Sequence, residues 1–176
     1  MTQVQVELDE NPARSASLAA EIADAHAEPL LSSVRALFLE YAASLPGIDL
    51  EYQGFDEDFA ALPGFYAPPS GALLLASVGD DPAGCIGLHA WEPGVAEMKR
   101  LYLKPAFRGQ GVGRALVVAV MDRARSLGYD RIRLDTLPTM LEAQALYRRL
   151  GFREIEPYRA SPIPGTRYFE AKLDGR

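Results

Sequence analysis

The chain has 176 residues, of which 48% are hydrophobic and 24% are charged, as is typical of one globular domain with a substantial core. A net charge of −6 argues against a nucleic-acid partner. No apolar run approaches the ~20 residues of a membrane span, and the N-terminus lacks the features of an export signal. A single cysteine, Cys85, excludes an internal disulfide framework. We therefore expect a cytoplasmic protein, monomeric or homodimeric, that binds neither membranes nor nucleic acid.

Hydrophobic spacing predicts the N-terminal elements. Residues 3–8 alternate between polar and apolar side chains and indicate a short strand. The Ala- and Ser-rich stretch Asn11–His26 predicts a loosely held helix or a mobile lead-in, so residues 1–28 are expected to be loosely ordered. A firmer helix is predicted from Pro29 to Ser44, because large apolar residues recur there at helical spacing.

Residues 48–70 are irregular and include a predicted short helix over Asp56–Leu62. Acidic residues are frequent in this region: Asp49, Glu51, Asp56, Glu57 and Asp58. We favour a solvated cap in which Asp56 bonds to the start of the helix. The alternative is an electronegative lip that attracts an amine.

The remaining elements alternate between strands and helices, without repeats or a second domain. Two apolar runs around the turn at Gly79–Pro82 predict a hairpin, and a third strand completes a meander. Thr139 and Glu142 match a capping box at the start of the last helix. The predicted strands are Ala72–Val78, Gly84–Trp91, Glu97–Lys104, Arg131–Thr136, Phe152–Tyr158 and Arg167–Leu173, and the predicted helices are Gly113–Leu127 and Met140–Leu150.

A glycine-rich turn follows the Glu97 strand and precedes a helix. Its pattern is Arg108-x-x-Gly111-x-Gly113. Glycines let the backbone approach a ligand closely, and the first amides of a helix favour anions. The spacing matches neither the dinucleotide pattern GxGxxG nor the P-loop, so a different pyrophosphate site is indicated. The alternative is a surface turn with glycines for geometry only.

The last predicted helix carries a second motif, Ala143-x-x-Leu146-Tyr147-x-x-x-Gly151-Phe152. The two motifs, in this order and separated by a strand, resemble those of the GNAT superfamily of acyl-CoA-dependent N-acetyltransferases. The resemblance covers roughly residues 72–173. One departure is Met140, which stands where many members have an Asn seven residues before the Tyr.

The resemblance implies an α/β (α+β) fold in one domain over residues 1–176. Its mixed, mostly antiparallel sheet would have about seven strands and about four flanking helices, and would splay between strands 4 and 5. It also implies that acetyl-CoA is a co-substrate, without a metal, and that a primary amine on a small molecule or peptide attacks it directly in a ternary complex. A longer acyl donor stays open, and the alternative function is a non-catalytic CoA-binding sensor or interaction module.

By the same resemblance, acetyl-CoA would contact residues from the central strand, the glycine turn and the last helix. Backbone groups on the strand would meet the pantetheine arm, and the turn would hold the pyrophosphate. These residues are Leu101, Tyr102, Leu103, Arg108, Gly109, Gln110, Gly111, Val112, Gly113, Arg114, Ala143 and Tyr147.

Two residues are predicted to be catalytic. Glu97 has the position of the base in some GNAT enzymes, acting directly or through water; the alternative is a strand-edge acid paired with Lys99 or Arg100. Tyr147 corresponds to the family's general acid, aimed at sulfur; the alternative is an aromatic residue in the core. The Leu101 amide is the candidate donor to the oxyanion.

Other polar residues give weaker predictions. His26 and His89 are expected to be structural, as is Cys85 in its apolar strand. Arg100 interrupts an apolar strand and could either clamp a substrate carboxylate or pair with an acid. Trp91, Tyr158 and the 159–165 loop could line the acceptor pocket or serve packing alone.

Overall fold

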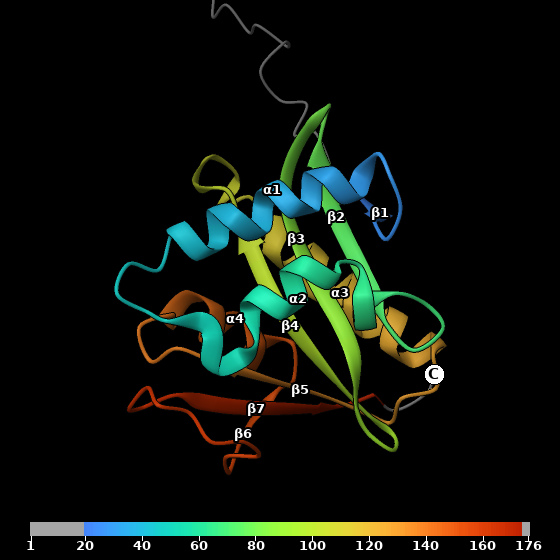
Figure 1. The fold of residues 1–176 in the computed structure, drawn as a ribbon. Coiled ribbons are helices and arrows are strands. Elements are labelled where there is room, and N and C mark those ends of the chain that lie inside the picture. The colour runs from blue at the N-terminus through green and yellow to red at the C-terminus, as the bar shows by residue number, and fades with distance from the viewer. Residues whose placement is uncertain (1–19, 174–176) are drawn as a thin grey trace, which may run out of the picture.

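The computed structural model of the chain describes residues 20–173, apart from the side chains of residues 52 and 53. Seven strands form one sheet in the order β1-β2-β3-β4-β5-β7-β6 (Figure 1). Neighbouring strands are antiparallel except β4 and β5, which are parallel. The predicted fold class is therefore confirmed, while the strand predicted for residues 3–8 lies outside the described residues.

Along the chain, β1 and two helices come first, the meander of β2, β3 and β4 follows, and strands and helices then alternate up to the final pair of strands. The strands are β1 (Glu21–Asp24), β2 (Ala72–Val78), β3 (Asp81–Glu92), β4 (Val95–Leu103), β5 (Arg131–Thr136), β6 (Arg153–Ile155) and β7 (Arg167–Lys172). The α-helices are α1 (Leu30–Ala43), α2 (Phe55–Ala61), α3 (Val112–Ser126) and α4 (Leu141–Arg149). Short 3-10 helices are η2 (Leu50–Gln53), η3 (Gly64–Tyr66) and η4 (Pro105–Phe107).

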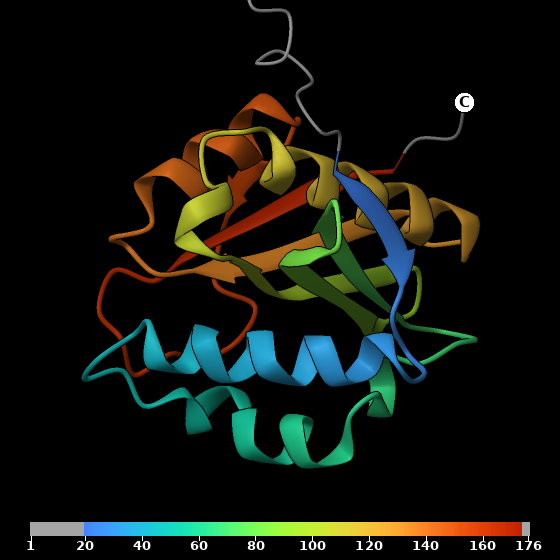
Figure 2. The same cartoon turned by 90° about the horizontal axis from the view of Figure 1, so that it is seen from above.

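Helices cover both faces of the sheet. Figure 2 shows α1 and α2 on one side and α3 and α4 on the other. Strand β2 is consequently buried on both faces, with Leu73 and Leu75 in the core beneath α1 and Leu74 in the core beneath α3. This explains why β2 reads as a continuous apolar run rather than an alternating one.

The N-terminal prediction is wrong where the structure describes it. Residues Glu21–Asp24, expected within a loose helix or lead-in, form β1 and pair with the edge of β2. Ile22 packs against the core beneath α3, and Ala25 is fully buried in the core beneath α1. Strand pairing and burial therefore override the helix propensity of an Ala-rich segment.

Three local predictions also need correction. The side chain of Asp56 does not cap α2; Gly54 begins that helix, and the Asp56 amide donates to Glu51 instead. Helix α4 begins after Met140 without a side-chain cap, so the predicted capping box is absent there. Strand β6 ends at Ile155 rather than Tyr158, because the following Pro157 has no amide hydrogen for the ladder.

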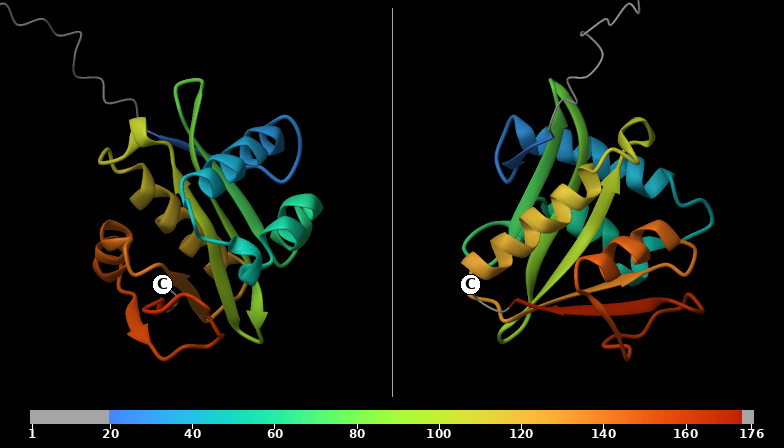
Figure 3. Two further views of the ribbon diagram at one scale, coloured as in Figure 1. Left: turned by 60° about the vertical axis from the view of Figure 1, so that its left-hand side comes forward. Right: turned by 180° about the vertical axis from the view of Figure 1, so that it is seen from behind.

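The parallel pair β4–β5 opens like a V. The paired positions run from Val95↔Arg131 to Glu97↔Arg133 and stop there, although both strands continue. Figure 3 shows the two strands diverging from their paired end. The splay between strands 4 and 5 predicted from the resemblance is therefore present.

A β-bulge in β4 lies beside this opening. Strand β3 pairs Gly87 with Lys99 and Cys85 with Tyr102, so two residues of β4 face one residue of β3. Arg100, in the bulge, has a φ of +59°, which is rare for a residue with a Cβ. The extra residue breaks the alternation of side chains, so that Lys99 and Arg100 both contact Asp58 in α2.

Candidate active site

The glycine turn between η4 and α3 has the geometry of an anion site. Gly111 has a φ of +83° and begins α3 in the left-handed region, which glycine adopts without strain. The first backbone bond of the helix runs from the Ala115 amide to the Gly111 carbonyl. The amides of Val112, Gly113 and Arg114 come before that bond and have no acceptor within the helix.

Gly113 brings this turn against the open part of the sheet. A Cβ at Gly113 would lie 2.9 Å from Leu103 Cδ1 and 3.8 Å from Leu146 Cδ2. A larger residue at 113 would therefore have to displace the Leu103 side chain of β4, whereas its distance to α4 would be an ordinary contact. Arg108 also contacts this end of β4, because its Nε donates to the Leu103 carbonyl oxygen at 3.2 Å.

A cavity lies where β4 and β5 separate. It brings together residues from α1, β4, β5 and α4 that are distant in the sequence. Its lining residues are Tyr41, Leu50, Lys99, Arg100, Leu101, Asp135, Thr136, Leu137, Met140 and Tyr147. Two sequence-predicted site residues, Leu101 and Tyr147, therefore share one cavity.

Tyr147 combines a core position with a polar tip at this cavity. Its ring packs against Phe152 and Phe169, and the residue is 5% exposed. Burial raises the pKa of the phenol, and the nearby charge of Asp135 acts in the same direction. The hydroxyl is therefore protonated near neutral pH and is available as a proton donor.

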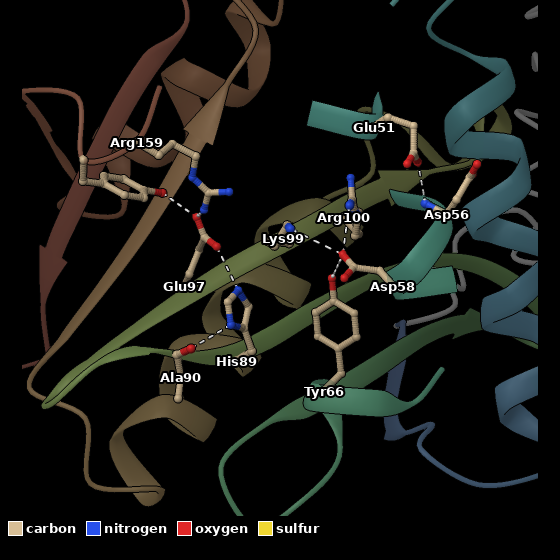
Figure 4. A network of polar contacts seen from close by, with 11 residues as sticks. Glu51, Asp56, Asp58, Tyr66, His89, Ala90, Glu97, Lys99, Arg100 and Arg159 are labelled. Carbon is tan, nitrogen blue, oxygen red and sulfur yellow. Dashed lines mark hydrogen bonds and ion pairs between the residues drawn. The ribbon is translucent and has the colours of Figure 1, made fainter. Parts of the chain in front are cut away.

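Glu97 lies at the closed end of the V and is fully buried. The Tyr158 hydroxyl donates to its Oε1 at 2.7 Å, and Arg159 forms an ion pair with the same oxygen. His89 Nε2 lies 2.8 Å from its Oε2 (Figure 4). The lining of the cavity does not include Glu97, so the structure brings together Leu101 and Tyr147 but keeps Glu97 apart from them.

His89 connects Glu97 to the backbone of β3. Its Nδ1 lies 2.7 Å from the Ala90 carbonyl oxygen, and burial lowers the pKa of the imidazole to about 4. A hydrogen atom lies between Nε2 of His89 and Oε2 of Glu97, and it is covalently bonded to one of these two atoms.

Lys99, Arg100 and Asp58 form a second buried polar cluster, which the sequence did not predict as a unit (Figure 4). Asp58 Oδ2 lies 3.4 Å from Lys99 Nζ and 3.0 Å from Arg100 Nη2, and the Tyr66 hydroxyl donates to it at 3.3 Å. Burial and the neighbouring Arg100 lower the pKa of Lys99. Asp58 is therefore part of an ion-pair network, not of the solvated cap expected from the sequence.

Some predicted site residues lie away from the cavity. Tyr102 points into the core beneath α1, where its hydroxyl donates to Glu40 at 3.4 Å. The exposed side chain of Gln110 donates to the Ala106 carbonyl. Ala143 packs against the core beneath α3. Trp91 and Tyr158, considered for the acceptor pocket, pack edge to face at 5.1 Å and are not part of the cavity lining.

Residues 20–173, which the structure describes, contain neither a membrane-spanning helix nor a cluster of metal ligands. None of the helices described there combines the length and apolar character that a bilayer crossing requires. Within the same residues, no three His, Cys, Asp or Glu side chains gather so that they could hold a metal ion.

Comparison with known families identifies this architecture. The model of the acetyltransferase (GNAT) family matches residues 34–152, which include β4, the glycine turn and all of α4. The chain belongs to the GNAT family. An uncharacterised N-acetyltransferase of Schizosaccharomyces pombe is 38% identical over 145 residues, which cover 81% of this chain and 88% of that protein. The sequence prediction of a GNAT N-acetyltransferase is therefore confirmed.

Other relatives of this GNAT protein agree. An uncharacterised N-acetyltransferase of Escherichia coli is 30% identical over 126 residues, covering 70% of this chain and 74% of that protein. A GNAT acetyltransferase structure from Staphylococcus aureus superposes with a TM-score of 0.71 at 22% identity, covering 89% of this chain and all of that one. The structure of yncA from Salmonella typhimurium, solved with its cofactor acetyl-CoA, superposes with a TM-score of 0.67 at 16% identity. The superposition covers 90% of this chain and 96% of that one. These two structures share the fold.

Proposed function

We propose that this GNAT protein transfers an acetyl group from acetyl-CoA to a primary amine by direct attack in a ternary complex. The observation that carries the proposal is the shared cavity of Leu101 and Tyr147 in the splay of β4 and β5. The glycine turn meets the same part of the sheet through Gly113 and Leu103. The presence of acetyl-CoA in the related Salmonella typhimurium structure supports this donor.

The pyrophosphate of the donor would be held by the turn from Arg108 to Gly113, with Arg114 adding charge. Free amides at the start of α3 and the positive end of the helix dipole both favour a phosphate group. A side chain at Gly109 or Gly111 would meet open space, so the turn leaves room for a ligand. The strand residues Leu101–Leu103 and Ala143 on α4 complete the proposed contact set.

Acetyl-CoA supplies a thioester carbonyl, which the neutral amine attacks while CoA leaves as a thiolate. We assign the Leu101 amide to the oxyanion that forms on the carbonyl oxygen. Tyr147, which is protonated at neutral pH and lines the cavity, donates a proton to the leaving sulfur. Met140 also lines the cavity. The position at which many family members have Asn therefore belongs to the site itself and is not remote from it.

The ammonium form of the acceptor must lose a proton before it attacks. We keep Glu97 as the proposed base, acting through water, because its own oxygens are occupied by Tyr158, Arg159 and His89. Direct contact with the amine would require one of these partners to leave.

We also propose that residues 1–176 form one GNAT domain, since the described residues share a single sheet and two helical layers. A cytoplasmic location is consistent with the unpaired, buried thiol of Cys85. The proposed partner is a small-molecule or peptide amine, and the protein is proposed to be a monomer or homodimer.

The test uses the purified full chain, acetyl-CoA and a panel of amines. Release of the CoA thiol measures turnover, mass spectrometry detects the N-acetylated product, and calorimetry measures CoA binding separately. CoA release that depends on an amine, together with the acetylated product, supports the proposal. Tight CoA binding without turnover of any amine would instead assign a non-catalytic CoA-binding module.

A further inference from the structure

The backbone carbonyl of Ala90 determines which nitrogen of His89 carries a hydrogen. His89 Nδ1 lies 2.7 Å from the Ala90 carbonyl oxygen, and a carbonyl oxygen can only accept a hydrogen bond. Nδ1 therefore carries a hydrogen. In a neutral imidazole only one nitrogen does so, which leaves Nε2 as a hydrogen-bond acceptor. The rings of Phe65 and Tyr66 in η3 pack against the imidazole and hold it in this orientation.

Nε2 of His89 faces an oxygen of Glu97 that can supply the hydrogen between them. The two atoms are 2.8 Å apart, so one of them donates to the other. Tyr158 and Arg159 both approach the other carboxyl oxygen, Oε1 (Figure 4). This division matches a protonated carboxyl group, in which Oε1 is the carbonyl oxygen that accepts and Oε2 is the hydroxyl oxygen that donates to Nε2.

The alternative is an imidazolium that donates from both nitrogens, one of them to a Glu97 carboxylate. Burial lowers the pKa of His89, and the positive charges of Lys99 and Arg159 lower it further. The backbone hydrogen bond and the charge of Asp58 act in the opposite direction, and the resulting pKa is about 4. The imidazole is therefore neutral at neutral pH, and the hydrogen in the gap belongs to Glu97.

We propose that His89 is a positioning residue for Glu97, because its Nε2 accepts the hydrogen of the protonated carboxyl group and stabilises the form in which Glu97 holds a proton taken from the amine. This inference rests on the proposed function, in which Glu97 is the base and acts through water. An ammonium N–H bond breaks, the nitrogen keeps the electron pair, water passes the proton on, and an O–H bond forms at Oε2. The described geometry is that of the proton-holding form.

An acceptor at this place opposes the other contacts of Glu97. Tyr158 and Arg159 donate to Oε1, and hydrogen-bond donors stabilise a carboxylate more than a carboxyl group. The lone pair of His89 Nε2 does the reverse, since it interacts favourably with the protonated form only. A general base is most effective when it can both take up and release a proton near the working pH. His89, which the sequence indicated to be structural, therefore has a role in the reaction as well.

Nitrogen NMR of the histidine rings tests the hydrogen positions without any turnover. The chain has two histidines, so His26→Gln and His89→Gln assign the two sets of ring signals in the labelled protein. His89 should show a neutral ring with its hydrogen on Nδ1 from about pH 5 to 8. Glu97→Gln should leave this unchanged, because its amide N–H replaces the hydroxyl group as donor to Nε2. An imidazolium in the wild type at neutral pH, or a neutral ring with its hydrogen on Nε2, would overturn the proposal.

A double-mutant cycle tests whether His89 acts through Glu97. His89→Phe keeps the ring and removes the acceptor, whereas His89→Gln keeps an amide oxygen that can accept. With acetyl-CoA and the best amine of the panel both saturating, His89→Phe should lower kcat by about tenfold and leave the KM for acetyl-CoA unchanged. His89→Gln should recover most of this rate, and His26→Gln should match the wild type. In the Glu97→Gln background, His89→Phe should change kcat by less than about twofold.

The outcomes separate this inference from the proposed function. If His89→Phe costs tenfold in the Glu97→Gln background as well, its effect is structural and the proposal is overturned. If Glu97→Gln acetylates amines at the wild-type rate, the transferase activity stands and the role of His89 is overturned. If CoA binds and no amine is acetylated, the proposed function fails and takes this inference with it. The NMR measurement decides the hydrogen positions even if His89→Phe does not fold.

Discussion

The Tyr158 hydroxyl donates a hydrogen bond of 2.7 Å to Oε1 of Glu97, although 61 residues separate the two in the chain. With Arg159 on the same oxygen and His89 on the other, one carboxylate connects β3, β4 and the segment after β6. Glu97 therefore has a structural role in addition to its proposed role as base. Different substitutions distinguish the two.

Glu97→Gln should lower kcat/KM mainly at low pH, by about 100-fold, because a base matters most when the amine is protonated. At high pH more of the amine is already neutral, so the loss should shrink. The measurement is a pH–rate profile of both proteins. A variant profile that follows the wild type would remove Glu97 from the mechanism.

Glu97→Ala should instead destabilise the fold, by about 3–5 kcal/mol, because it removes a fully buried carboxylate and leaves Arg159, whose side chain is 15% exposed, without this ion-pair partner. Urea unfolding of the alanine and glutamine variants gives the comparison. We expect the glutamine variant to lose clearly less stability, since its amide oxygen still accepts from Tyr158. Equal stability of the alanine variant and the wild type would contradict the structural role.

Gly111→Asp should abolish CoA binding while the fold survives. A side chain at Gly111 meets nothing within 4 Å, so an added carboxylate would confront the pyrophosphate rather than the protein. The positive φ costs both Asp and Asn about 1 kcal/mol, which makes Gly111→Asn the matched neutral control. Calorimetry with CoA should show binding for Asn and none for Asp; unchanged affinity of the aspartate variant would refute the anion site.

Tyr147→Phe should slow turnover by about 10- to 100-fold with little change in CoA affinity. The ring contacts with Phe152 and Phe169 remain, so thermal stability should hardly change. Leaving groups of lower pKa need less help from an acid, so an activated acetyl thioester should recover part of the rate. Full activity of the phenylalanine variant would reduce Tyr147 to a packing residue.

Asp24→Asn tests how β1 is attached to α3. The Arg123 guanidinium donates two hydrogen bonds, of 2.5 and 2.9 Å, to the Asp24 carboxylate. The bond to Arg123 lowers the pKa of Asp24. A carboxyl group whose pKa is lowered in the folded state stabilises the protein fully at pH values above its ordinary pKa of 3.8. This stabilisation is lost as the pH falls through the lowered pKa. Because Asp24 is 42% exposed, the variant should lose less than about 1 kcal/mol near neutral pH.

Urea unfolding at neutral pH and again below the lowered pKa provides the measurement. The difference between wild type and Asp24→Asn should disappear in acid. Asp122→Asn is the control, since Asp122 pairs with Arg125 inside α3 and does not hold β1. A difference that grows in acid would contradict the assigned sign.

Local sequence signals predicted the elements that depend on local chemistry. The bounds of β2, β5 and α1 follow from apolar runs and spacing, and the turn ending at Gly111 follows from its glycines. Strand β1 was missed because an Ala-rich segment has no strand signal of its own. Its conformation is decided by the free edge of β2, about 50 residues later in the chain.

The polar clusters could not be predicted, because their members meet only in the folded chain. Asp58 contacts Lys99 across 41 residues, and the bulge that turns Arg100 to the same side depends on the register with β3. A strict alternation would have sent Arg100 to the opposite face of the sheet. The full burial of Glu97 likewise depends on Tyr158 and Arg159, which arrive from the segment after β6.

The extra residue at Arg100 divides β4 into two parts that are out of phase. Before it, Met98 faces α3; after it, Leu101 and Leu103 face α3 again, while Lys99 and Arg100 remain on the opposite side. The bulge thus matters as much as the composition of this short stretch, because strict alternation of the same residues would turn Arg100 toward α3 and Leu101 into the layer of α1.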